Sequence, residues 1–183
     1  MTPTDESSSE DFDALVRRVD PDRWLATRFV ADPVARADLA TLYAFDHELA
    51  RASAVTSTPL LAEIRLTWWI EMLDEAYGGR PVRRHPVAQA LADLIARRGL
   101  PRSAIEPMIE SRLAVLEAGG PASEAEAVYA AALILDPATP DDATPNSLSG
   151  AAFPAALPLL ARSVSNPVWK RLRMVWAVAT GRI

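Results

Sequence analysis

Prolines stand at the start of the apolar segments of this chain, and their placement constrains the fold more than any other feature. The pairs that set a potential capping residue before a proline are Asp20-Pro21, Asp32-Pro33, Thr58-Pro59, His85-Pro86 and Asn166-Pro167. Each pair precedes apolar residues that recur with a period of about 3.6 residues, the repeat of an α-helix. Because proline fits the first helical turn but not the interior of a helix, these prolines predict helix starts.

The pattern predicts an all-α fold. We expect helices over residues 21–31, 33–52, 59–77, 86–97, 102–118, 124–135 and 167–180, after a first periodic stretch with Phe12, Leu15, Val16 and Val19. The dominance of Ala, Leu and Arg also favours helix over strand. At 183 residues the chain is long enough for one domain with a substantial core.

Composition divides the chain into four parts. Residues 1–10 are acidic and are expected to form a disordered tail, and residues 11–135 are expected to form the helical body. Residues 136–150, DPATPDDATPNSLSG, lack apolar periodicity and are rich in proline, which predicts a linker. Residues 151–183 then form a C-terminal helical appendage.

Composition also excludes several functions. The chain has no cysteine, which removes disulfides, thiolate nucleophiles and zinc–cysteine sites. No apolar run approaches the ~18 to 20 residues of a membrane span, and the start has neither the basic nor the apolar region of a signal peptide. With a net charge of −5 the chain is not expected to bind nucleic acid. We expect a cytoplasmic protein.

Two local patterns leave a choice between a structural and a functional interpretation. Glu71, Asp74 and Glu75 share one helix face, and they either hold a cation or pair with nearby arginines on a solvent face, which we favour. Trp68 and Trp69 diverge by about 100° around the helix. One of them is expected to fill the core while the other lies at its edge.

The C-terminal helix has an apolar face and a basic face. Trp169 and Trp176 lie among the apolar positions, and Lys170, Arg171 and Arg173 lie on other faces. This pattern suits a helix that lies on an anionic membrane surface, and it also suits a helix that packs against the body. Both interpretations stay open.

Three blocks of sequence resemble, in order, the N-terminal half of the squalene/phytoene synthase family. The blocks read DRWLATRFVADPVARADLATLYAFDHELAR, EIRLTWWIEMLDEAYGG and HPVAQALADLIARRGLP, and the resemblance covers about residues 22–129. It implies a single-domain helical bundle similar to a truncated isoprenoid synthase fold. Active members of that family are prenyltransferases that join two isoprenoid diphosphates, with Mg²⁺ held by two aspartate-rich motifs.

The metal-binding carboxylates of the family are missing from the first of these motifs. By resemblance, its aspartates would fall near Ala50, Arg51 and Ala54, none of which binds a cation. Asp46 and Glu48 lie nearby, but two residues apart on a helix they point about 200° from each other and cannot share a metal. We therefore expect no catalytic residue and no metal site.

One branch of the family has sequence motifs similar to those of this chain. The segments A-F-x-x-E-L-A at 44–50 and R-L-x-W-W at 65–69 resemble the mitochondrial assembly factor of respiratory complex I and its bacterial relatives. The resemblance implies a catalytically inactive binding or assembly protein, peripheral on the inner membrane, with complex I subunits as partners and no cofactor. The alternatives are a Mg²⁺-dependent prenyltransferase of the phytoene or squalene synthase type and an isoprenoid- or lipid-binding module.

The segment LYAFDHELAR is expected to divide its side chains between core and surface. Leu42, Phe45 and Leu49 are expected to pack against the body. The residues expected to form a surface for a ligand or partner are Tyr43, Asp46, His47, Glu48, Arg51, Arg65, Trp68 and Trp69.

Overall fold

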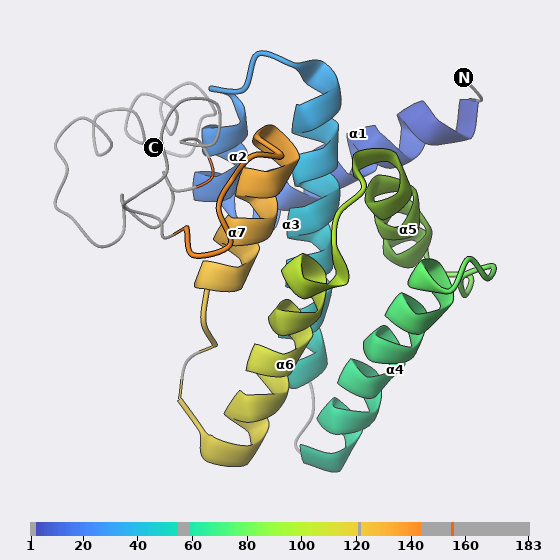
Figure 1. Cartoon of the computed structure of the whole chain (residues 1–183), viewed down its shortest axis with the longest axis vertical. Coiled ribbons are helices and arrows are strands. Elements are labelled where there is room, and N and C mark those ends of the chain that lie inside the picture. Colours follow the sequence, from blue (N-terminus) through green and yellow to red (C-terminus); the bar gives the residue numbers. More distant parts are fainter. Residues whose placement is uncertain (1–2, 55–58, 121, 144–154, 156–183) are drawn as a thin grey trace, which may run out of the picture.

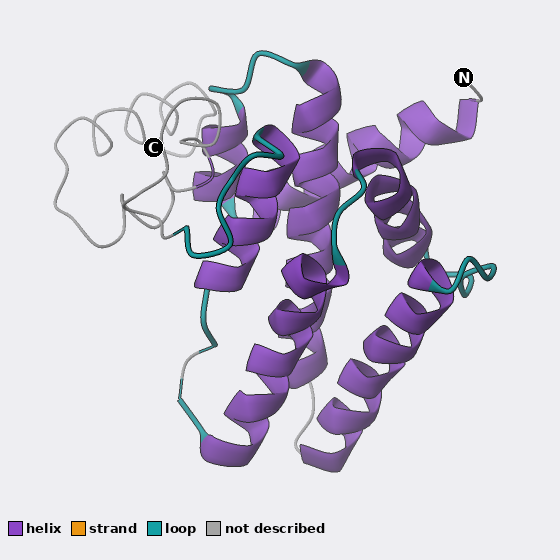
Figure 2. Cartoon of the chain, in the orientation of Figure 1, coloured by secondary structure: helices purple, strands orange, loops and turns teal. Residues whose placement is uncertain are grey.

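The computed structural model describes residues 3–54, 59–120, 122–143 and 155. The helices within these residues are α1 (Pro3–Val19), α2 (Pro21–Thr27), α3 (Pro33–Ala54), α4 (Pro59–Tyr77), α5 (Pro86–Arg98), α6 (Arg102–Ala118) and α7 (Ala125–Leu135). Within these ranges there is no strand (Figure 2), so the predicted all-α fold is confirmed. No helix among the described residues is both long and apolar enough to cross a membrane.

The predicted helix starts at prolines are confirmed for α2, α3, α4 and α5. Asp20 accepts a hydrogen bond from the Arg23 amide at 3.0 Å, and Asp32 accepts one from the Val34 amide at 2.9 Å. These carboxylates satisfy amides that have no partner inside the helix. His85 precedes Pro86 without a side-chain cap, and histidine is not among the preferred capping residues.

α2 is shorter than its apolar pattern predicted. The expected helix ran over residues 21–31, but α2 ends at Thr27. The amides of Arg28, Phe29 and Val30 each bond to the carbonyl three residues earlier, which tightens the chain into a turn. The next helix begins at Pro33. Because proline disfavours helical geometry at the residue before it, here Asp32, α2 cannot continue into α3.

The acidic start of the chain does not form the disordered tail that was expected over residues 1–10. The structure places residues 3–10 in α1, which begins at Pro3 and continues to Val19. Pro3 suits the first helical position, because proline fits the first turn of a helix. An acidic composition alone therefore did not identify this helix start.

α3 is the central helix of the body. It contacts each of the other six helices and runs through the middle of the view in Figure 1. Leu42, Phe45 and Leu49 are fully buried, as predicted. The exposed residues of α3 are Pro33 and Val34 at its start and Arg51 near its C-terminal end, and the C-terminal end is the one that lines a pocket with α4.

The C-terminal half of α4 is tied to α6 by an ion-pair network. Arg102 donates to Asp74 at 2.6 Å and to Glu106 at 2.5 Å. The hydrogen bond from Arg102 lowers the pKa of Glu106, against the opposing effect of burial. The Tyr77 hydroxyl donates to the carbonyl of Leu100 at 3.1 Å, and burial raises the pKa of Tyr77 to about 12.

Part of the predicted linker and nearly all of the predicted appendage lie outside the described residues. Residues 136–143 form turns after α7, and Ala155 is buried in the core. The predicted helix 167–180 is not among the described residues. The same holds for its candidate membrane contacts, Trp169, Lys170, Arg171, Arg173 and Trp176.

The Arg102–Glu106 pair predicts a pH-dependent contribution to stability. Because the folded state lowers the pKa of Glu106, its stabilisation is present above the ordinary value of 4.5 and is lost as pH falls through the lowered pKa. Glu106→Gln should reduce the free energy of unfolding by up to ~1 kcal/mol at pH 7. In urea unfolding, this difference from wild type should narrow toward pH 3.

Glu110→Gln on the exposed side of the same helix is the matched control, and it should change little at either pH. A Glu106→Gln deficit that is as large at pH 3 as at pH 7 would contradict the account.

Candidate functional site

Asp46, the α3 acid expected at the surface, lies in a buried ion-pair cluster. Arg23 of α2 donates through Nη1 to its Oδ2 at 2.5 Å, and Arg112 of α6 donates through Nη2 to its Oδ1 at 3.0 Å. The residue is 8% exposed. Each carboxylate oxygen already faces a guanidinium, so the charge of Asp46 is compensated inside the protein.

Arg23 is the centre of this buried cluster. Its guanidinium also lies 3.6 Å from Asp20 and 3.6 Å from Glu124, and it stacks over the ring of Tyr43 at 5.2 Å. Burial lowers the pKa of Arg23, but Asp46, Tyr43 and Asp20 together raise it above its usual value. Burial raises the pKa of Tyr43 to about 12, so the ring stays neutral beside a charged arginine.

The prediction that Tyr43 and Asp46 face a ligand or partner is therefore wrong. Tyr43 is 4% exposed and packs in the core, and Asp46 is enclosed by its arginines. The periodicity of α3 could not reveal this, because Arg23 and Arg112 lie 23 and 66 residues away from Asp46 in the sequence. His47 is partly exposed and lines neither the cluster nor the pocket described next.

An open pocket of about 370 Å³ lies between the C-terminal end of α3 and the middle of α4. We call it the α3–α4 pocket, and its lining residues are Glu48, Arg51 and Ala52 of α3, Ile64, Arg65, Trp68 and Trp69 of α4, and His85. The structure thus brings together most of the predicted ligand or partner surface. The members of that surface that line the pocket are Glu48, Arg51, Arg65, Trp68 and Trp69.

Aromatic rings form the inner wall of the α3–α4 pocket. Trp69 meets Phe45 edge to face at 5.2 Å and Trp68 at 4.9 Å. Trp69 is 4% exposed whereas Trp68 is half-buried, which confirms the predicted division between core and edge. The packed rings give the pocket a rigid apolar wall.

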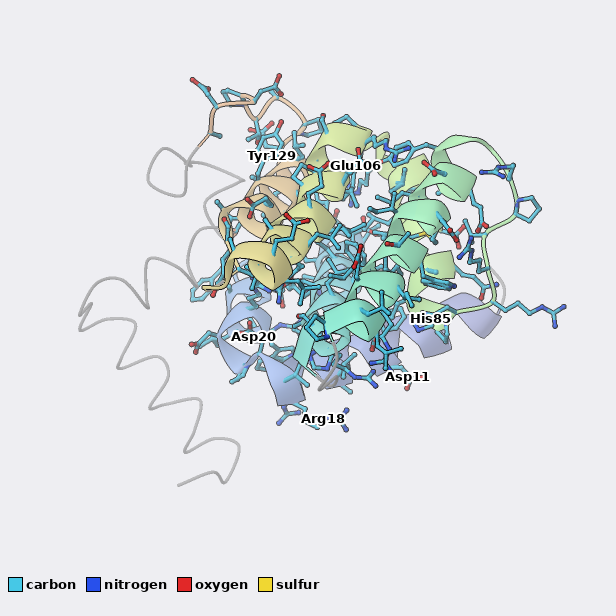
Figure 3. All side chains as sticks on the ribbon, turned by 90° about the horizontal axis from the view of Figure 1, so that it is seen from below. Asp11, Arg18, Asp20, His85, Glu106 and Tyr129 are labelled. Carbon is cyan, nitrogen blue, oxygen red and sulfur yellow. The ribbon has the colours of Figure 1, made fainter. Side chains whose placement is uncertain are left out.

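His85 completes this wall, a position that its sequence context did not predict. Its ring lies 5.2 Å from Trp69 and 5.7 Å from Trp68, at the loop before α5 (Figure 3). Its Nδ1 atom is buried and has no hydrogen-bond partner among the described residues. The sequence showed only a histidine before a proline, and its contact with the tryptophans depends on how α5 returns along α4.

The polar groups of the α3–α4 pocket are mainly cationic. Arg51 pairs with Glu48 at 2.7 Å, and Arg65 is exposed without an ion pair to another described residue. Two guanidinium groups and one carboxylate leave the mouth positive. Such a pocket suits an apolar group that carries a negative charge, because the rings bind the apolar part and the guanidiniums bind the anion.

The acidic face of α4 is salt-bridged, as favoured from the sequence. Arg83 donates to Glu71 at 2.6 Å and to Glu75 at 2.9 Å, and Asp74 pairs with Arg102. The hydrogen bonds that Arg83 donates to Glu75 and Glu71 raise the pKa of Arg83. These carboxylates are already engaged by arginines, so this face does not present a free carboxylate cluster to a cation.

The described residues do not contain a group of three or more histidine, aspartate or glutamate side chains that could hold a metal ion. Together, the fold and the site define an all-helical protein whose central helix carries a buried, arginine-paired carboxylate and an open cationic-aromatic pocket. The model of the squalene/phytoene synthase family matches residues 16–133, and the chain therefore belongs to that family. Neither a curated protein nor a solved structure matches the chain significantly.

The buried cluster predicts a large difference between two neighbouring acids of α3. Asp46→Ala leaves Arg23 and Arg112 without their shared counter-ion and should lower the free energy of unfolding by ~3 kcal/mol. This loss is at the low end of what breaking a buried ion pair costs, because Asp20 and Glu124 remain within 3.6 Å of Arg23. Urea unfolding followed by circular dichroism measures the loss.

Glu48→Gln is the control for this measurement, since Glu48 pairs with an exposed arginine and should contribute less than ~1 kcal/mol. Equal effects of the two substitutions would show that the Asp46 cluster is not buried in solution.

Proposed function

We propose that this protein is a non-catalytic member of the squalene/phytoene synthase family that works by binding a partner. The observation that carries the proposal is that the carboxylate of Asp46 is paired with arginines inside the protein. By resemblance this acid lies near the position of the family's first aspartate motif, and both of its oxygens are occupied by Arg23 and Arg112.

The chemistry of the family explains why this matters. Ionisation of an allylic diphosphate leaves negative charge on pyrophosphate, and Mg²⁺ held by carboxylates stabilises that charge. Arg51 stands approximately where a motif aspartate would be, and a guanidinium has no lone pair to offer a metal. A positive side chain at this place supports the loss of metal-dependent chemistry.

By resemblance, the family's second aspartate motif would fall in the region now occupied by residues 136–150, and the acids of this region support the same proposal. Asp136 accepts a hydrogen bond from the Ala138 amide at 3.0 Å, and Asp141 accepts one from the Tyr129 hydroxyl at 2.8 Å. Asp142 is the last acid in the sequence. Two of these carboxylates thus stabilise local turns.

We propose assembly of respiratory complex I, at the cytoplasmic face of the inner membrane, as the specific role. The two sequence motifs that resemble the assembly-factor branch supply several residues of the α3–α4 pocket, namely Glu48, Arg65, Trp68 and Trp69. Exposed arginines beside a half-buried tryptophan are typical of binding hot spots. A complex I subunit that presents an acidic and apolar segment would fit this pocket.

The same pocket supports a second candidate function, which is the binding of an isoprenoid or another lipid. Its volume of about 370 Å³ and its aromatic wall suit an apolar chain, and Arg51 and Arg65 could pair with an anionic head group. A Mg²⁺-dependent prenyltransferase would need the same pocket together with metal ligands from outside the described residues.

The assembly role predicts a defect in the respiratory chain. Deletion of the gene should lower NADH-dependent quinone reduction in membranes, and the wild-type gene should restore it. Arg51→Ala removes a cation from the pocket mouth and should fail to restore the activity. Arg18→Ala removes an exposed arginine of α1 that does not line the pocket, and this variant should restore the activity fully.

Normal quinone reduction in the deletion strain would remove complex I assembly as the role. Restoration by Arg51→Ala at wild-type level would leave the role intact but would rule out the pocket mouth as the contact. Immunoblots of membranes and cytosol should show equal amounts of the two variants.

A further inference from the structure

α4 carries an apolar stripe on the side that faces away from the body. Leu60 is 61% exposed, Leu61 50% and Ile64 55%, and Trp68 continues the stripe one turn later. The buried face of α4 lies on the opposite side of the helix, where Leu66 and Leu73 are fully buried. Leu60, Leu61, Ile64 and Trp68 are called the α4 stripe from here on.

The α4 stripe is larger than the scattered apolar side chains of an ordinary surface. Its residues stand at i, i+1, i+4 and i+8, so they form one continuous ridge on the helix. A shallow groove of about 260 Å³ runs along the same ridge past Thr67. Contiguous exposed apolar surface of this kind marks an interaction site.

Two charges of opposite sign flank the α4 stripe. Glu63 and Arg65 lie about 100° to either side of Ile64 around the helix, so one borders each edge of the stripe. Both are exposed, and neither forms an ion pair with another described residue. The stripe is thus apolar at its centre, negative along one edge and positive along the other.

This arrangement is self-complementary under one symmetry operation. A twofold axis parallel to α4 places the stripes of two copies face to face and sets the negative edge of each copy against the positive edge of the other. One contact would then form two Glu63–Arg65 pairs between the copies. A pair of antiparallel helices would instead oppose Glu63 with Glu63 and Arg65 with Arg65.

We propose that the α4 stripe is the contact of a homodimer in which the two α4 helices run parallel. Glu71 lies on the same side of the helix one turn beyond the stripe, and its pairing with Arg83 reduces repulsion between the copies there. An anionic membrane surface fits the stripe less well, because Glu63 on its edge would be repelled.

The homodimer also bears on the α3–α4 pocket. Ile64, Arg65 and Trp68 belong to both the stripe region and the pocket lining, so the second copy would stand beside the mouth of the pocket. The dimer would therefore present two pockets that flank one interface. This inference does not depend on the proposed role in assembly, and each can fail alone.

Cysteine cross-linking tests the proposal cleanly, because the chain has no cysteine of its own. In a parallel dimer Ile64 lies close to the axis and meets Ile64 of the second copy. Ile64→Cys should therefore form a disulfide-linked dimer under mild oxidation. Ala114→Cys, an exposed position on α6, should remain monomeric under the same conditions.

Charge exchange tests the direction of the helices. Glu63→Arg and Arg65→Glu should each weaken dimerisation by about tenfold, because each turns two attractive pairs into repulsive ones. The double variant, with both substitutions, should dimerise like the wild type. Sedimentation velocity over a range of concentrations measures the association, and circular dichroism confirms that the variants keep their helices.

A wild type that stays monomeric at its solubility limit would overturn the proposal. Cosedimentation of such a monomer with anionic liposomes, lost in Ile64→Glu, would assign the stripe to a membrane instead. A dimer whose association is unchanged by both single charge reversals would have either antiparallel α4 helices or an interface on another surface, and either result overturns the proposed parallel pair.

Discussion

The buried contact among Arg23, Asp46 and Arg112 constrains the rest of this structure. Removing charges from water is costly, and the cost is offset only when each charge has a close counter-ion in good geometry. The three residues come from α2, α6 and the central helix α3, so the contact fixes how these helices meet. It also commits the carboxylate of α3 to a structural role, since metal binding would have to displace two arginines.

The same helix serves two purposes at different points along its length. In its middle, Tyr43, Phe45 and Asp46 are buried against other helices, whereas Glu48 and Arg51 nearer its C-terminal end meet α4 at an open pocket. The outer face of α4 then adds an apolar surface next to that pocket. Active members of the family use this fold to enclose a reaction. In this chain, the pocket and the outer face of α4 are open surfaces that suit binding.

Much of the fold could be predicted because its determinants are local. Proline after a capping residue marks helix starts, and the 3.6-residue period identifies the buried positions of α3 such as Leu42 and Phe45. The burial of Asp46 could not be predicted, because it depends on arginines contributed by two other helices. The contacts of His85 could not be predicted for a similar reason. The helical start of the chain could not be predicted from composition, because acidic residues occur both in disordered tails and at helix starts.

We propose that the α3 carboxylate, held by arginines, does not support prenyl transfer. Pyrophosphate release from farnesyl or geranylgeranyl diphosphate by the full chain, with and without Mg²⁺, tests this proposal. Release should be no faster than in protein-free buffer under both conditions. Release that requires both the protein and Mg²⁺, and yields a head-to-head product, would contradict it.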